Sequence, residues 1–130
     1  MVDERLADGE RIARLLSSEI HGHERGALGR LAVVGAAESV EPSEAGAFAY
    51  AVRADDERRV AEVAVHPDRC HVEFRAAVET AAAAGHREGL RVRPKATEPP
   101  RTLVFVENGA EVKGALRVVR AVGETLDDGG

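Results

Sequence analysis

Three stretches of alternating apolar and polar residues, joined by two short turns, constrain the fold of this chain most. The stretches cover residues 48–53, 61–66 and 70–75, and an alternation of period two is typical of β-strands. Turns centred on Asp56-Glu57 and Pro67-Asp68 would join them as antiparallel hairpins. A slip by one residue would move the apolar side chains to the other face, so the pattern predicts one register. The predicted pairs are Val65 with Cys70, Val63 with Val72, Ala61 with Phe74, Phe48 with Val65, Tyr50 with Val63 and Val52 with Ala61.

Helical patterns lie on either side of this meander. A helix is predicted over 8–22, where Asp8 is suited to cap it and Gly22 and Gly26 to end it. The Ala-rich stretch 76–86 predicts a second helix. Asn108 with Glu111 resembles a capping box that opens a third helix over 109–122. The apolar stripe of the first helix consists of Ile12, Leu15, Leu16 and Ile20.

Further strands are predicted over 29–36, 89–93 and 102–106. The last of these is apolar on both faces, which favours a central strand covered on both sides. Residues 1–6 and 124–130 are expected to be frayed or disordered. The sequence therefore predicts a single α+β domain, with an antiparallel β-meander packed against about three helices.

Composition limits the classes of protein to which the chain can belong. Its 130 residues are 44% hydrophobic and 32% charged, which is too apolar for a disordered chain and too charged for a membrane protein. Cys70 is the single cysteine, and the first residues are polar and acidic rather than a secretory signal. We therefore expect a cytoplasmic protein without a membrane partner.

The charge balance points to a salt-adapted source. The net charge is −5, and only Lys95 and Lys113 are lysines among 18 basic residues. An acidic, lysine-poor sequence rich in Ala, Val, Glu and Arg suggests a GC-rich, halophilic organism.

A group of basic residues in the predicted strand at 89–93 and in the Pro-rich segment after it is the first candidate site. Arg91 and Arg93 alternate with the apolar Leu90 and Val92, so both arginines point to one side of a strand. Lys95 continues this polar series, and Arg101 follows the stiff Pro99-Pro100 pair. Four cations on one rigid surface could hold a phosphate or carboxylate. The alternative is a solvated strand face whose arginines pair with nearby acids.

Nucleic acid fits this group of cations poorly. For a site with four phosphate contacts, raising the salt concentration from about 0.1 M to 3 M would weaken binding by roughly five orders of magnitude. The group also has no aromatic neighbours on which bases could stack. A compact anion would bind better at high salt than a nucleic acid.

Histidine and cysteine residues form a second candidate, a metal site. His21 and His23 are close in sequence, as are His66, Cys70 and His71. The predicted register, however, directs Cys70 into the core and His71 to the opposite face, so the two cannot bind one ion. A buried thiol is also a poor nucleophile. We therefore predict no metal site and no catalytic cysteine.

The helix start at Glu107-Asn108-Gly109 is a third candidate, because helix N-termini attract anions. Glu107 and Glu111 would repel an anion there, which favours simple capping. No P-loop, GxSxG, GxGxxG or HExxH pattern occurs, so we predict neither a cofactor nor motif-borne catalysis.

One family resembles this chain. The similarity is carried by GLRVRPKA at 89–96, PPRTLVFVE at 99–107 and AEVK at 110–113, and it extends from the first helix through Val72-Glu73-Phe74-Arg75. In these segments the chain resembles a family of short uncharacterised haloarchaeal proteins. The resemblance implies a salt-adapted cytoplasm and carries no activity or site residue with it.

Three functions remain open from the sequence. The leading hypothesis is a non-catalytic binding module whose cations Arg91, Arg93, Lys95 and Arg101 meet an anionic ligand or protein partner. The second is a structural protein that forms homo-oligomers. Its contact would be a face of small residues, Ala47, Ala49, Ala51 and Ala64. The third is a small-molecule enzyme without a recognisable motif.

Overall fold

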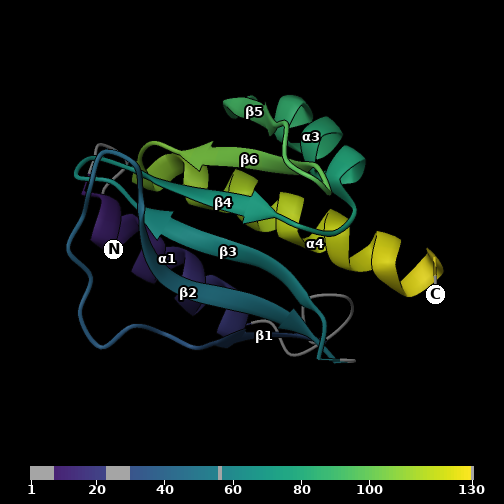
Figure 1. Cartoon of the computed structure of the whole chain (residues 1–130), viewed down its shortest axis with the longest axis horizontal. Helices are drawn as coiled ribbons and strands as arrows, with labels where there is room; N and C mark the ends of the chain where they lie inside the picture. Colours follow the sequence, from purple (N-terminus) through teal and green to yellow (C-terminus); the bar gives the residue numbers. More distant parts are fainter. Residues whose placement is uncertain (1–7, 23–29, 56, 130) are drawn as a thin grey trace.

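The computed structural model describes residues 8–22, 30–55 and 57–129 of the chain. Predictions for residues 1–6, His23, Gly26 and Asp56 lie outside these ranges. Within them the chain forms an α+β fold of one domain, with three α-helices and one six-stranded sheet. Its helices lie together behind the sheet in Figure 1, and the front of the sheet faces the reader. No helix in the described part of the chain is long and apolar enough to cross a bilayer.

The sheet is antiparallel throughout, and its strands lie in the order β1-β2-β3-β4-β6-β5. The strands β2, β3 and β4 form the predicted meander, β1 pairs with β2 at one edge, and the β5–β6 hairpin extends the sheet beyond β4. Their bounds are β1 Leu31–Val34, β2 Ala47–Ala54, β3 Arg59–Val65, β4 Cys70–Phe74, β5 Val92–Lys95 and β6 Arg101–Val106.

The β3–β4 hairpin has the predicted register. Val65 pairs with Cys70, Val63 with Val72 and Ala61 with Phe74. The turn between them has Pro67 and Asp68 at its centre and is closed by a 2.8 Å hydrogen bond from His66 N–H to Arg69 O. A proline at the second turn position pre-sets its φ, which explains why the sequence fixes this hairpin so well.

The β2–β3 hairpin follows the prediction only in its middle. Tyr50 pairs with Val63 and Val52 with Ala61, as predicted, but a bulge between Phe48 and Tyr50 shifts the register. The prediction of Phe48 opposite Val65 is therefore wrong, because Phe48 pairs with Ala64. The extra residue of a bulge interrupts the alternation, so Phe48, which precedes the bulge, points to the face opposite the predicted one. Phe48 is consequently 42% exposed instead of buried.

Three helices cover one face of the sheet. They are α1 Gly9–His21, α3 Val78–Arg87 and α4 Val112–Gly129, and the short helix η1 Gly109–Glu111 precedes α4. Asp8 caps α1, since its side chain accepts a hydrogen bond from Arg11 N–H at 3.1 Å. Asn108 accepts one from Glu111 N–H at 3.1 Å, which confirms the predicted cap. The Glu111 side chain in return accepts from Glu107 N–H at 2.8 Å.

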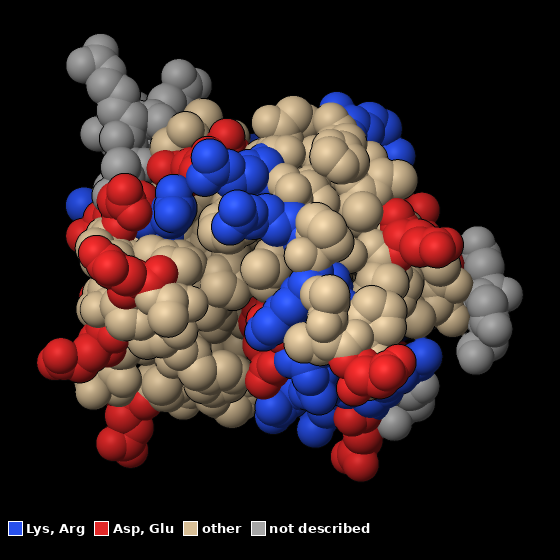
Figure 2. Space-filling view, turned by 45° about the horizontal axis from the view of Figure 1, so that its top comes forward, with Lys and Arg blue, Asp and Glu red and all other residues tan. Residues whose placement is uncertain are grey.

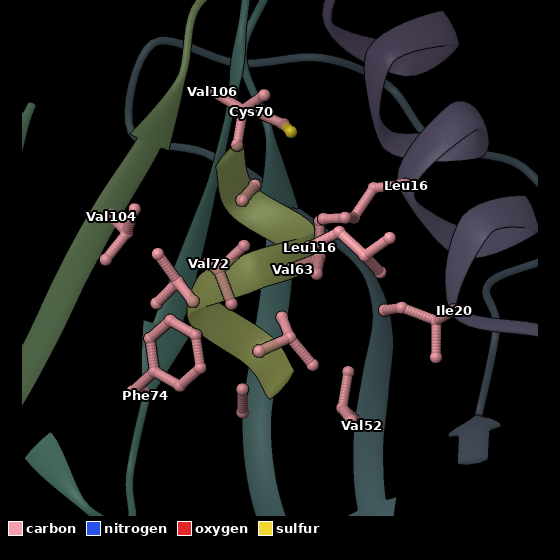
Figure 3. Close-up of a cluster of buried hydrophobic side chains, with 14 of the residues drawn as sticks. Leu16, Ile20, Val52, Val63, Cys70, Val72, Phe74, Val104, Val106 and Leu116 are labelled. Atoms are coloured by element: carbon pink, nitrogen blue, oxygen red, sulfur yellow. The ribbon is translucent and has the colours of Figure 1, made fainter. Parts of the chain in front are cut away.

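The core between helices and sheet consists mostly of small aliphatic side chains. Figure 3 shows Leu16 and Ile20 of α1 pointing toward Leu116 of α4 and toward Val52 and Val63 of the strands, with Phe74 on the other side of the cluster. Phe74 is the largest of the fully buried side chains and is 1% exposed. The small side chains allow close helix–sheet contact, so a large ring such as Phe74 contributes a large share of the buried apolar area.

Two predicted boundaries and the predicted covering of one strand differ from the structure. The strand predicted at 89–93 is β5 at Val92–Lys95, so it includes Pro94, which an edge strand tolerates. The strand β6 is second from the edge. None of the helices in the described ranges covers its face opposite the core, where Arg69 and His71 lie over Phe105 instead. The helix α4 runs to Gly129, seven residues beyond the predicted end and into the stretch for which fraying is expected.

Gly9 at the start of α1 is required by a close backbone approach. A Cβ at this position would lie 1.9 Å from His66 O and 2.3 Å from Arg69 O, both in the backbone of the β3–β4 turn. We expect Gly9→Ala to lower the free energy of unfolding by about 1–3 kcal/mol, because backbone must move. Gly114→Ala in α4 is the control, since its Cβ would meet nothing closer than 3.4 Å. It should raise stability by about 0.5–1 kcal/mol in chemical denaturation, and an equal loss in both variants would contradict the packing.

Candidate anion-binding face

The face of the sheet opposite the helices carries the charged side chains of β3 to β6. We call it the open face. Strand alternation places Glu62 and Glu73, which pair with each other, on this face together with Leu103, which pairs with Glu73 and Arg93. The next rung holds Arg101 paired with Lys95. Figure 2 shows the β5 end of the molecule turned forward, and lysine and arginine side chains gather on it.

The two glutamates are held by cations from four chain segments. Glu62 lies 3.1 Å from Arg59, 3.8 Å from Arg75 and 3.9 Å from Arg101. Glu73 contacts Arg101 and lies 3.3 Å from Lys95. We name the whole group the open-face cluster. It consists of Arg59, Arg75, Arg93, Lys95 and Arg101 with Glu62 and Glu73.

The open-face cluster carries excess positive charge. Four of its cations lie within 4 Å of the two carboxylates, and the fifth, Arg93, is separated from Glu73 by Leu103 in the sheet. Five cations and two carboxylates give the cluster a formal charge of +3 on a chain of net charge −5. Burial alone would raise the pKa of Glu73, but hydrogen bonds from Arg101 and Lys95 outweigh it and hold that pKa below its usual value. Both glutamates therefore help to fix the cations in place without neutralising them all.

The four sequence-predicted cations all lie on the open face, but they differ in their partners. Lys95 and Arg101 are paired with glutamates, as the alternative interpretation of a solvated face expects. Arg91 lies outside the cluster, 3.6 Å from Glu107, which Arg69 also contacts at 3.3 Å. Arg93 is exposed and has no acidic side chain within 4 Å among the residues that the structure describes. Arg93 is thus the cation most available to a ligand.

A shallow cavity of about 340 Å³ adjoins the cluster. It lies between the start of α3 and the connection from β5 to β6, and Lys95 and Arg101 form part of its lining. The rest of the lining is mainly apolar. It consists of Val78, Ala82, Pro94, Ala96 and Pro100, with Glu79 and Thr102.

Two histidines are buried at the other end of the open face. His66 Nε2 and His71 Nδ1 are 2.8 Å apart, and His66 Nδ1 lies 2.8 Å from Glu44 O. Because a carbonyl oxygen only accepts, His66 Nδ1 carries the proton of that bond. In the neutral pair, His71 Nδ1–H then donates to His66 Nε2. The hydrogen bonds of this pair connect the loop before β2 with the β3–β4 hairpin.

Burial determines the protonation of His71. It lowers the pKa of His71 to about 4, and the charges of His66, Lys95 and Arg69 act in the same direction, while Glu73 opposes them. His71 is therefore neutral near pH 7. This neutral imidazole lies next to Phe105, whose ring centroid is 5.4 Å away.

The structure separates the residues of the predicted cysteine and metal candidates. Cys70 lies in the core and His71 on the open face, as the register predicts. Burial raises the pKa of Cys70 to about 12, which keeps the thiol protonated. His21 is the last residue of α1, whereas Cys70 and His71 belong to β4. In the described ranges no three His, Cys, Asp or Glu side chains come together as a metal site would require.

A second cavity, of about 380 Å³, lies between α1 and the loop after β1. Tyr50 lies in its lining and donates a 2.7 Å hydrogen bond to Ala13 O, and burial raises the pKa of this phenol. Ser17 and Ser18 provide hydroxyl groups, but no histidine or cysteine is among the described residues that line it. The carboxylates of the described lining come from Glu10 and Glu38.

Sequence reasoning missed four members of the cluster: Arg59, Glu62, Glu73 and Arg75. A signal for them was present. The correct β3–β4 register places Glu62 directly opposite Glu73, and like charges opposite each other destabilise a sheet unless cations lie between them. The same register therefore predicts that cations from neighbouring strands approach this pair.

Comparison with known proteins gives one match. The model of a family described as "Family of unknown function (DUF7993)" matches residues 1–130. No curated protein and no solved structure matches the chain.

Proposed function

Because the chain belongs to DUF7993, a family of unknown function, over its whole length, we propose a function from the geometry of its surface: a non-catalytic module that binds an anion on the open face. The observation that carries this proposal is the open-face cluster, in which four cations contact two carboxylates and Arg93 adds a fifth positive charge on the same face. Arg93, Lys95 and Arg101 are the ligand-binding residues. Arg91 belongs to the neighbouring ion pairs with Glu107 and supports them.

Preorganisation supports this function. The glutamates hold Arg101 and Lys95 in position before a ligand arrives, so less side-chain freedom is lost on binding. A guanidinium can form two parallel hydrogen bonds with one phosphate or carboxylate, which is more specific than a point charge. A compact anion with more than one charge fits the excess of +3 best.

A titration calorimetry experiment with inorganic pyrophosphate tests the proposal. The wild type should bind it, and Arg93→Ala and Arg101→Gln should each weaken binding about tenfold, the effect expected for the loss of one charge-assisted hydrogen bond. Arg120→Ala is the matched control, because Arg120 is exposed on α4 and belongs to no cluster in the described part of the chain. Equal affinity in all four proteins, or no binding by the wild type, would exclude the function.

The haloarchaeal origin, the cytoplasmic location and the homo-oligomer remain predictions. The oligomer has one supporting feature, since the exposed Phe48 lies on the open face beside Ala64. Exposed apolar side chains of this kind are common singly on monomers, so the anion site has the stronger support.

A further inference from the structure

The cavity beside the open-face cluster differs from it in chemistry. Pro94 and Thr102 pair in the sheet and face the helix layer, and Thr102 Oγ1 donates a 2.9 Å hydrogen bond to Val78 O of α3. This bond fixes the start of α3 against β6. The hollow that remains beyond it, about 340 Å³, is lined mainly by proline, alanine and valine side chains. Apolar surface of this kind favours an apolar occupant over water.

Two basic side chains lie at the edge of this apolar cavity. Lys95 and Arg101 form the last rung of the β5–β6 pair, and both contribute to the lining of the cavity as well as to the cluster. Glu79 of α3 also lines the cavity and would repel an anion on its side. An anionic group is therefore favoured only at the β5–β6 border, with the apolar lining behind it.

We propose that the ligand of the open face is an amphipathic anion: a free, water-soluble phosphate or carboxylate with a short alkyl chain that occupies the cavity between α3 and the β5–β6 connection. This inference rests on the proposed anion binding. Lys95, Arg101 and Arg93 hold the charged group, and Ala82, Pro94 and Pro100 contact the alkyl chain. The cations thus recognise the charged end of the ligand, and the apolar lining recognises its alkyl end.

Calorimetric titrations with inorganic phosphate and with methyl, butyl and hexyl phosphate test the inference. Each methylene that enters the cavity should tighten binding about threefold, somewhat less than complete burial would give because the cavity is shallow. Hexanoate should also bind, but more weakly than hexyl phosphate, because its carboxylate is the weaker charged group. Vesicles with and without anionic lipid serve as a further probe, and the proposal predicts no vesicle binding.

Two neighbouring alanines on α3 give a matched pair of variants. Ala82 lines the cavity, whereas Ala83 is exposed and does not. Ala82→Leu should fill the cavity and abolish the gain with chain length, while binding of inorganic phosphate stays unchanged. Ala83→Leu should leave the whole series as in the wild type. If Ala82→Leu fails to fold, nuclear Overhauser effects from the hexyl chain to the Val78 and Ala82 methyl groups of the wild type replace it.

The outcomes separate this inference from the function on which it rests. Affinity that rises with chain length in the wild type and not in Ala82→Leu supports it. Phosphate binding that does not depend on chain length overturns the inference and leaves anion binding standing. If affinity still rises with alkyl length in Ala82→Leu, the alkyl chain binds elsewhere and the inference is overturned. Binding to anionic vesicles alone would overturn it as well. No binding of any probe overturns both proposals.

Discussion

Phe74→Ala is expected to lower the free energy of unfolding by about 3–5 kcal/mol, the range for removal of a buried phenylalanine. The ring is 1% exposed and lies among aliphatic side chains from β3, β6 and the helices. Small neighbours such as Ala61 and Val63 cannot move far enough to fill the space that the ring leaves. Since the free energy of unfolding of small domains is about 5–15 kcal/mol in total, this variant should lose a large fraction of the stability of the protein.

Phe48→Ala provides the control for this effect. Phe48 is 42% exposed because the β2 bulge turns it to the open face, so its truncation should cost less than about 1 kcal/mol. Urea denaturation of both variants measures the difference. Similar losses would mean that the bulge is absent and that Phe48 is buried after all.

Acid should destabilise the protein through His71. Its pKa is about 4 in the folded chain and 6.5 in the unfolded one, so only the unfolded chain takes up this proton between the two values. The contribution of neutral His71 to the free energy of unfolding is therefore fully present above pH 6.5. It falls by roughly 3 kcal/mol as the pH approaches 4. Denaturation curves recorded between pH 7 and pH 4.5 measure this loss.

His71→Asn distinguishes this titration from that of the carboxylates. Asparagine does not titrate in this range and can still donate a hydrogen bond toward His66 Nε2. The variant should lose much less stability between pH 7 and pH 4.5 than the wild type. A loss of the same size in both proteins would show that other groups cause it.

The sequence predicts those parts of the fold that local chemistry decides. The β3–β4 register follows from Pro67 in the turn and from the alternation on either side of it. The caps at Asp8 and Asn108 follow in the same way from short polar side chains at helix starts. Each of these features depends on residues that are close together in the sequence.

Other features depend on packing between distant segments. The pattern Phe48-Ala49-Tyr50 alternates as a regular strand would, and nothing in it reveals a bulge. The position of β5 at the sheet edge depends on how α3 crosses behind the sheet, with Gly85 close to Val92. The partners of Arg101 could be inferred from the register, but the cavity beside it could not, because its lining combines α3 with the β5–β6 connection.

The location of the bound anion is the central claim, and a two-dimensional NMR titration with pyrophosphate tests it most directly. Resonances of the arginine side chains and of the backbone amides should be followed together. The account predicts saturable shifts at Arg93, Lys95, Arg101 and the adjoining residues of β4 and β6, with the exposed surfaces of α1 and α4 unchanged. Shifts centred on the helices, or none at the cluster, would contradict it.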